Sequence, residues 1–290
     1  MSDNRNPQLE QMSDESMVRN LAAQAVAIWP QERGLFLRQP VPVTGRILDA
    51  GCGTGEVSSR LAELFPEARV DAVDIIDSHL DRARRNYPHL AGRLRFAHGD
   101  AFALDFPDET FDLTVCRHVL QAIPHADRVI VELARVTKAG GWLHLIVEDY
   151  GMIHMAPTRL DVNGFWNEVP WAFERATGTD LHIGRNAFTI MTDLGFRDMT
   201  LDYVVVDPLR VDREVFAQIW EAWRDGYSSA IAEHSKFNRQ EVLEYWDDMI
   251  ACIRSRRGYA VWQVPVVRAL KPPPGGVPRA AAAHGAPGVC

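Results

Sequence analysis

The sequence predicts an α/β fold: a mostly parallel sheet with helices on both faces. Three observations carry this prediction. From Arg46 onward, short apolar runs alternate with helix-like segments, which is the pattern of a parallel sheet with crossover helices. A glycine-rich turn follows the first of these runs. The 290 residues, 47% of them hydrophobic, are enough for one such domain with an added cap.

The alternation gives five early strands and two late ones. We expect the early strands at 46–50, 69–73, 94–97, 111–116 and 142–147, with helices between them. The segment 149–183 shows no clear strand. A helix is expected near 187–194, and the late strands at 200–206 and 259–269. Between the late strands, apolar residues at helix-like spacing predict a helical segment over 212–257.

These elements suggest a division of the chain into a core, a cap and two tails. We expect a disordered tail over 1–15, cap helices over 16–42, a cofactor-binding core over 43–148, a cap insertion over 149–183, the end of the core sheet over 184–270 with a helical cap insertion at 212–257, and a disordered tail over 271–290. Pro30 is expected to end the first cap helix or to open a second one.

Composition narrows the class of partner. The net charge of −8 argues against a protein that grips nucleic acid by its phosphates. No run approaches the roughly 18 apolar residues of a membrane span. Cys52, Cys116, Cys252 and Cys290 are scattered and predict reduced thiols in the cytoplasm. We therefore expect a cytoplasmic monomer or homodimer that acts on a small molecule, without nucleic acid, membrane or metal partners.

The glycine-rich turn points to a particular cofactor. Residues 47–56 are ILDAGCGTGE, so Gly51, Gly53 and Gly55 follow a strand and precede a helix. A dinucleotide site has the spacing GxGxxG and holds a pyrophosphate at the helix start. Here Glu56 stands at the last glycine position, and a carboxylate is a poor neighbour for pyrophosphate. The loop therefore favours S-adenosylmethionine, which has no phosphate, over NAD.

Acidic residues at neighbouring strand ends support this choice. Asp74 ends the second strand 19 residues after Gly55, where a carboxylate reaches ribose hydroxyls. Asp100 follows the third strand and is expected to accept from the adenine amino group, with Ala101 beside the ring. Asp49 fits a role near the amino group of the cofactor; its alternative role is to cap the following helix or bind loop amides.

Residues 46–147 resemble the class I S-adenosylmethionine-dependent methyltransferases, a broad family that includes ubiquinone-biosynthesis and small-molecule enzymes. The matching pieces are ILDAGCGTGE, VDAVD, HGDA, FDLTVCRHVLQAIP and ELARVTKAGGWLHL. The resemblance implies a Rossmann-like, seven-stranded sheet whose last strand is antiparallel. The expected cofactor-binding residues are Asp49, Gly51, Gly53, Gly55, Asp74, Ile75, Asp100, Ala101 and Arg117.

Three candidate catalytic residues follow the fourth and fifth strands. His118 lies close to the expected position of the reacting methyl group, either as a structural or binding residue or as a base. Glu148 and Tyr150 could orient a substrate or accept its proton; the alternative is that they only form local hydrogen bonds. His154 and His182 are plausible cap histidines to which we assign no catalytic role.

The cap composition suggests the kind of acceptor. Five of the eight tryptophans lie in the two insertions that leave the ends of strands, above the expected cofactor: Trp166, Trp171, Trp220, Trp223 and Trp246. They either pack a helical core or wall an apolar pocket. We predict methyl transfer to an N, O, S or C atom of a small aromatic or apolar metabolite. The alternatives are a nicotinamide dehydrogenase, a methyltransferase of macromolecules and a non-catalytic S-adenosylmethionine-binding module.

Overall fold

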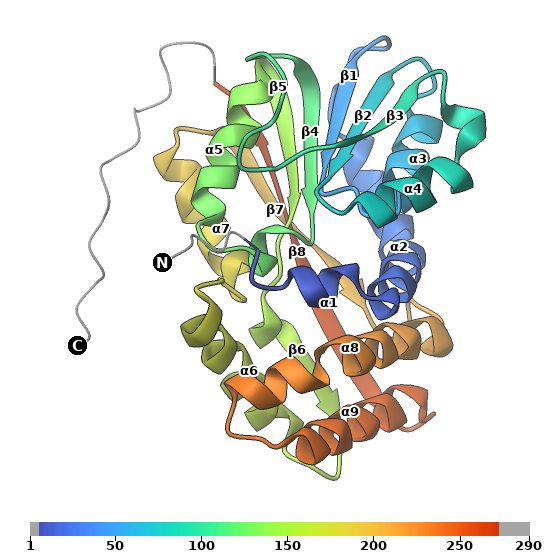
Figure 1. Cartoon of the computed structure of the whole chain (residues 1–290), viewed down its shortest axis with the longest axis vertical. Helices are drawn as coiled ribbons and strands as arrows, with labels where there is room; N and C mark the ends of the chain where they lie inside the picture. The colour runs from blue at the N-terminus through green and yellow to red at the C-terminus, as the bar shows by residue number, and fades with distance from the viewer. Residues whose placement is uncertain (1–5, 273–290) are drawn as a thin grey trace.

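The computed structural model describes residues 6–272, and these form two lobes joined by one sheet (Figure 1). The strands are β1 (Arg46–Ala50), β2 (Arg69–Asp74), β3 (Leu94–His98), β4 (Phe111–Arg117), β5 (Thr137–Ile146), β6 (Ile153–Ala156), β7 (Arg197–Val206) and β8 (Tyr259–Leu270). Their order is β3-β2-β1-β4-β5-β8-β6, and β7 pairs with the other edge of β8. Strands β1 to β5 are parallel and β8 is antiparallel to β5, as predicted.

Strand β8 connects the two lobes. Its carboxyl half pairs with β5, and its amino half pairs with β6. In Figure 1 it is the long red strand that runs from the upper lobe into the lower one. The prediction of no strand in 149–183 was wrong, and the described sheet has eight strands rather than seven. The four residues of β6 alternate between buried and exposed, which is too short a pattern to recognise without the partner strand.

Helices cover both faces of the upper sheet, which confirms the predicted fold class. The helices are α1 (Leu9–Ser13), α2 (Glu15–Phe36), α3 (Glu56–Leu64), α4 (Asp77–Asn86), α5 (Ala126–Val136), α6 (Val162–Thr177), α7 (Ile183–Asp193), α8 (Arg213–His234) and α9 (Arg239–Arg254). Apolar residues of α3 and α4 pack with the end of α2 on one face. Those of α5 and α7 pack on the other. None of the described helices is long and apolar enough to cross a membrane.

The amino-terminal region is more ordered than predicted. Residues 9–13 are helical, and Asp14 caps α2 by accepting a hydrogen bond from the Ser16 amide at 2.8 Å. Helix α2 continues through Pro30, where we expected a break. Directly after the proline, Gln31 exchanges two hydrogen bonds with the Val205 backbone, at 2.9 and 3.1 Å. These contacts with β7 fix the second half of α2, so tertiary packing overrides the local effect of proline.

The lower lobe is a helical cap around an aromatic core. Helices α6, α8 and α9 pack with the lower ends of β6 and β8. The predicted helical segment 212–257 consists of two helices, and α9 starts at a capping box formed by Asn238 and Glu241. The core of the lower lobe contains the fully buried side chains of Trp220, Trp246 and Trp262.

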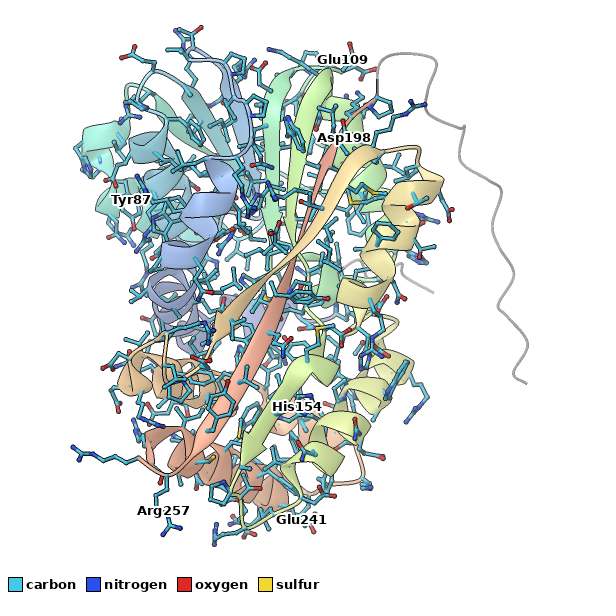
Figure 2. The ribbon with its side chains drawn as sticks, turned by 180° about the vertical axis from the view of Figure 1, so that it is seen from behind. Tyr87, Glu109, His154, Asp198, Glu241 and Arg257 are labelled. Atoms are coloured by element: carbon cyan, nitrogen blue, oxygen red, sulfur yellow. The ribbon has the colours of Figure 1, made fainter. Side chains whose placement is uncertain are left out.

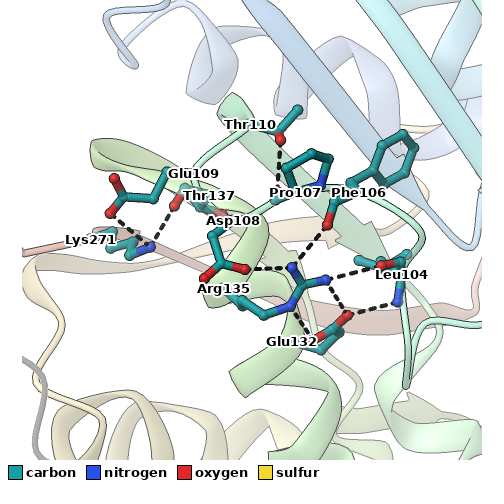
Figure 3. A network of polar contacts seen from close by, with 10 residues as sticks. All are labelled: Leu104, Phe106, Pro107, Asp108, Glu109, Thr110, Glu132, Arg135, Thr137 and Lys271. Atoms are coloured by element: carbon teal, nitrogen blue, oxygen red, sulfur yellow. Dashed lines mark hydrogen bonds and ion pairs between the residues drawn. The ribbon is translucent and has the colours of Figure 1, made fainter.

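Arg135 of α5 fixes the loop between β3 and β4 (Figure 3). Its guanidinium donates to the carbonyl oxygens of Leu104 and Phe106, at 3.0 and 2.9 Å, and to the Glu132 carboxylate. Glu132 in turn accepts from the Leu104 amide at 2.7 Å. The loop includes Asp100, so this network steadies a segment that carries a residue expected at the cofactor site.

The predicted tail over 271–290 is described only at its first two residues. The Lys271 ammonium donates to the Thr137 carbonyl at 2.6 Å, and its amide donates to the Gly141 carbonyl at 2.9 Å. Lys271 therefore belongs to the folded domain rather than to a tail. Residues 273–290, Cys290 among them, lie outside the described residues, as do residues 1–5 of the other predicted tail.

Candidate active site

A cavity lies between the carboxyl ends of the parallel strands and the helical cap. Its core side is lined by Gly51, Gly53, Asp74, Ile75, Asp100, Ala101, Phe102, Arg117, His118 and Glu148. Its other walls come from α2 and from the cap helices α6, α8 and α9. Most of the residues predicted from the sequence therefore meet at one place.

The glycines of the first loop allow a close approach of the backbone to this cavity. Gly51 and Gly53 have φ angles of +76° and +53°, which disfavour side chains. A Cβ atom on Gly53 would lie 2.7 Å from the Leu21 side chain, and one on Gly51 would collide with Val119. Both positions require glycine for conformation and for space.

Gly55, which we also expect at the cofactor site, occupies a tightly packed position. It is not among the residues that line the cavity. It precedes α3 with a φ of +86°, and a Cβ atom there would lie 2.8 Å from the Phe96 ring. The structure gives Gly55 a role in packing α3 against β3, which the regular glycine spacing could not distinguish from ligand contact.

Asp74 connects the loop with the end of β2. Its two carboxylate oxygens accept from the amides of Gly53 and Ile76, at 2.7 and 2.9 Å. Burial raises the pKa of this carboxyl above its ordinary value. A carboxylate has about four acceptor positions. Asp74 can therefore hold the loop and still accept from two vicinal hydroxyls in the cavity.

Asp100 and its neighbours form the next part of the wall. One Asp100 oxygen accepts from the Phe102 amide at 2.9 Å, which closes a tight turn after β3. Ala101 and Phe102 line the cavity beside it, as does Ile75 after β2. This segment offers a carboxylate next to apolar surface, the combination expected for an adenine ring.

Asp49 lies one layer behind the glycine loop. It lines a smaller adjoining cavity together with Gly51, Arg117 and His118, and it accepts a hydrogen bond from Ser58 of α3 at 2.6 Å. Burial raises its pKa to about 6, although the Ser58 hydroxyl and Arg117 oppose the change. This bond is to the side chain of Ser58 and no side chain among the described residues caps the start of α3, so Asp49 does not take the capping role that we gave as its alternative. Its place beside the cavity leaves its role near the amino group of the cofactor as a proposal.

Arg117 belongs to a buried charged cluster that the sequence did not reveal. Its Nε and Nη2 atoms lie 2.8 Å from the two Glu32 carboxylate oxygens, and His144 Nε2 lies 3.0 Å from one of them. Burial opposes ionisation of Glu32, but Arg117 and His144 outweigh it and lower its pKa to about 2. We missed the cluster because Pro30 was expected to end the first helix or to open a second one. The available signal was Glu32, a carboxylate four residues after Ile28 on the buried stripe.

His118 and Glu148 form a pair where β4 and β5 end. His118 Nδ1 lies 2.5 Å from one Glu148 oxygen, and Trp262 Nε1 donates to the other at 3.2 Å. The second ring nitrogen, His118 Nε2, has no hydrogen-bond partner among the described residues. His118 has a φ of +54°. Residues other than glycine seldom adopt this conformation, although histidine does so more often than most. Backbone strain of this kind often marks functional positions.

Tyr150 faces the cap rather than the polar pair. Its ring stacks on Trp166, with centroids 5.6 Å apart and planes 6° apart, and meets Trp223 edge-on. Burial raises the pKa of the Tyr150 phenol well above 10, and the neighbouring Glu148 adds to this. A phenol so hard to ionise does not suit the role of base that the sequence left open, so we interpret Tyr150 as a wall residue.

The two cap histidines lie away from the cavity lining. His154 is exposed on β6, on the rear of the lower lobe (Figure 2). His182 is buried, stacks on Trp171 and bonds Glu174 at 2.7 Å. Together with Asp180 these side chains lie close enough to hold a metal ion. However, Asp180 already accepts from Asn186 and from the His182 amide, so the cluster is explained by its own hydrogen bonds.

Comparison with known proteins finds similarity to methyltransferases over part of the chain. A family model described as a methyltransferase domain matches residues 47–141. Over this region the chain is similar to the class I S-adenosylmethionine-dependent methyltransferases that its sequence resembles. A malonyl-[acyl-carrier protein] O-methyltransferase of Halorhodospira halophila is 32% identical over 199 residues, 67% of this chain and 61% of that protein. A trans-aconitate 2-methyltransferase of Methylobacterium nodulans is 33% identical over 115 residues, 40% and 43% of the two chains.

A solved structure supports the same fold. Phosphoethanolamine N-methyltransferase 2 of Haemonchus contortus aligns with a TM-score of 0.58 at 19% identity, covering 90% of this chain and 59% of that one. That enzyme was solved in complex with S-adenosylhomocysteine and, in a second structure, with S-adenosyl-L-methionine. The matched regions span 19–61% of the curated relatives, and the family model matches about a third of this chain.

The residues of the cavity also fit S-adenosylmethionine, independently of the comparisons. Side chains of Val119 and Leu21 pack so closely on Gly51 and Gly53 that the loop backbone can border the cavity in this way only as glycine. Asp74 and Asp100 stand at successive strand ends. Buried polar atoms without a hydrogen-bond partner among the described residues, Asn20 Oδ1 and Gln121 Oε1, belong to residues of the same lining. Such atoms are rare in proteins unless a ligand or water completes them.

Proposed function

We propose that the protein transfers a methyl group from S-adenosylmethionine to a small molecule held under the cap. The observation that carries the proposal is the single cavity lined both by the glycine-loop edge and by the aromatic cap helices. Bound there, the cofactor would supply an electrophilic methyl group on a sulfonium. The enclosing cap favours a small acceptor over a macromolecular surface. We also propose a cytoplasmic monomer or homodimer; the described cysteines, Cys52, Cys116 and Cys252, are buried and free.

The core residues divide between the parts of the cofactor. Asp74 is assigned to the ribose hydroxyls, and Asp100 with Ala101 and Ile75 to the adenine. Asp49, Arg117 and the loop backbone at Gly51 and Gly53 are assigned to the amino-acid end. Asp49 would attract the ammonium group, whereas Arg117 has its charge already balanced by Glu32 and serves mainly to shape this end.

The polar pair would handle the acceptor proton. With Nδ1 bound to Glu148, the neutral imidazole of His118 keeps a lone pair on Nε2. Glu148 would orient the ring and stabilise the imidazolium that forms when Nε2 takes a proton. Alignment of the acceptor by the cap would supply a further share of the rate, because held reactants avoid an entropic cost of roughly 7–11 kcal/mol.

Calorimetric titration with S-adenosylhomocysteine tests the cofactor assignment. We expect Gly53→Arg to abolish binding, because its side chain would enter the space next to Leu21. Asp74→Ala should weaken binding about 100-fold or more, since hydrogen bonds to a charged group are worth about 1.5–3 kcal/mol each. Asp105→Ala is the matched control, because Asp105 is an exposed aspartate of the loop between β3 and β4, and it should leave the affinity for S-adenosylhomocysteine unchanged. Unchanged affinity in both site variants would overturn the assignment.

The non-catalytic alternative is tested by turnover. A binding module would bind S-adenosylhomocysteine, but it would form no S-adenosylhomocysteine from S-adenosylmethionine with any acceptor supplied. The relatives named above act on different acceptors by their names, so the acceptor class must be argued from this cavity.

A further inference from the structure

The acceptor side of the cavity is short of positive charge. Among the described residues that line the cavity, the acidic ones are Asp74, Asp100 and Glu148, and the one with a permanent positive charge is Arg117. That arginine is paired through two contacts of 2.8 Å with Glu32, which is fully buried. An anionic acceptor would therefore find no free counter-charge among these residues.

Glu148 places a negative charge where the core meets the cap. Its oxygens are held by His118 Nδ1 and Trp262 Nε1, and it is 1% exposed. With the imidazole neutral, the pair carries one net negative charge. A buried charge without a full counter-ion attracts a cation strongly, because the surroundings screen it weakly.

Aromatic rings form the opposite wall. They come from the turn after β5 and from three cap helices: Tyr150, Trp166, Phe173, Trp223, Tyr227 and Trp246. Tyr150 stacks on Trp166 and meets Trp223 edge-on, and Trp166 meets Trp246 edge-on with centroids 5.8 Å apart. Burial keeps both phenols neutral by raising the pKa of Tyr150 and of Tyr227. The faces of such rings attract cations.

We propose that the methyl acceptor is an amine carried on an apolar or aromatic body. The inference rests on the proposed function and adds the acceptor class to it. The ammonium form would be drawn in by Glu148 and by the ring faces, while its body would fill the apolar space among the tryptophans. A carboxylate or phosphate of the same size would meet Glu148 with no cation to balance it.

The same residues complete the chemistry of an amine. The ammonium gives one proton to His118 Nε2 and becomes a neutral amine with a lone pair. The nitrogen lone pair forms the bond to the methyl carbon as the carbon–sulfur bond breaks, and that electron pair stays on sulfur. The products are a methylated ammonium, a neutral thioether and a protonated His118, which later releases its proton to solvent.

Binding of three matched probes to the protein saturated with S-adenosylhomocysteine tests this inference. The probes are 3-phenylpropan-1-amine, 3-phenylpropan-1-ol and 3-phenylpropionate, which share a ring and a three-carbon chain and differ in head-group charge. Calorimetry at pH 7.5 should give the amine the tightest binding and the carboxylate the weakest, with about tenfold or more between these two. Equal affinities, a tighter carboxylate, or no binding by the amine would overturn the proposal.

Two variants locate the effect. Glu148→Gln should reduce the preference for amine over carboxylate to within about threefold, because it removes the charge and keeps the shape. Glu233→Gln, on an exposed position of α8, should retain it. A preference unchanged in a folded Glu148→Gln protein would contradict the role of Glu148; if that variant does not fold, the ranking of the three probes in the natural protein still decides. Failure of the first titration, with S-adenosylhomocysteine alone, would instead reject the proposed function itself.

Discussion

The two sides of the cavity are built in different ways. The core side takes its polar groups from the carboxyl ends of β1 to β5 and the short turns after them, each within a few residues of a strand. The cap side takes its walls from side chains on α6, α8 and α9, which are separated by up to about 80 residues of sequence. In the proposed function the local turns hold the cofactor, whereas the packed helices present a surface to the acceptor. We therefore expect changes on the two sides to separate cofactor binding from acceptor binding.

The largest effect should come from the residue at the junction of the two sides. His118→Asn keeps a side chain that tolerates the positive φ and removes the proton acceptor. We expect kcat to fall about 10²–10⁴-fold, the usual contribution of a general base, with the affinity for S-adenosylhomocysteine within about threefold. His125→Asn, an exposed histidine with a φ of +57°, is the matched control. Equal activity of the two variants would remove His118 from the mechanism.

The next effect concerns the attachment of α2 to the core. Glu32→Gln leaves Arg117 buried without a full partner and should lower the free energy of unfolding by about 3–5 kcal/mol in thermal or urea unfolding. The folded pKa of Glu32 is depressed to about 2. Ionised Glu32 therefore contributes to the free energy of unfolding above its unfolded pKa of 4.5, and this contribution is lost as pH falls toward 2.

The matched change at an exposed ion pair separates charge from burial. Glu15→Gln removes a partner of Arg82 on the surface and should cost about 0.2–1 kcal/mol at most. Similar losses of unfolding free energy for Glu15→Gln and Glu32→Gln would contradict the claim that the buried cluster contributes more to stability than the exposed ion pair.

Asp49 should show opposite effects on stability and on cofactor binding. Its folded pKa of about 6 exceeds its ordinary value of 3.8, so the folded state binds this proton more tightly, and the carboxyl subtracts stability as pH rises from about 4 to 6. Asp49→Asn should therefore stabilise the ligand-free protein above pH 6 by about 1–3 kcal/mol. The same variant should bind S-adenosylhomocysteine more weakly and lose the decline in affinity expected for the natural protein below about pH 6. Destabilisation at pH 8 would contradict the raised pKa.

The smallest effect concerns a bridge across the cavity. The Tyr227 hydroxyl of α8 donates to Gln8 Oε1 at 3.0 Å and thereby links the cap to the segment before α1. Tyr227→Phe should cost about 0.5–1.5 kcal/mol and speed amide hydrogen exchange in α1. Tyr245→Phe, on α9, has no such bridge and is the control. Unchanged exchange in α1 would show that other contacts hold this segment.

Much of the core could be predicted because each of its features is local. The turn at Gly51 and Gly53, the acid at the end of β2 and the alternating strands can each be recognised within about ten residues. The antiparallel last strand followed from the family resemblance, whereas the order of the strands was not predicted. Gly55 shows the limit of this approach, because a loop glycine needed for packing and one needed for a ligand leave the same pattern.

The features that sequence analysis missed depend on contacts between distant segments. Helix α2 passes Pro30 because Gln31 bonds β7, some 170 residues away. The Glu32 cluster brings together side chains from α2, β4 and β5. Strand β6 exists because β8 extends beyond the core and offers it an edge. None of these partners can be inferred from the local pattern of either segment.

A crystal structure with bound S-adenosylhomocysteine would test the central claim most directly. We predict that the ribose lies against Asp74, the adenine beside Asp100 and Ala101, and the sulfur on the side of His118, Glu148 and the cap aromatics. A ligand bound elsewhere, or bound here with its sulfur turned away from His118 and the cap, would contradict the division of the cavity into a cofactor side and an acceptor side.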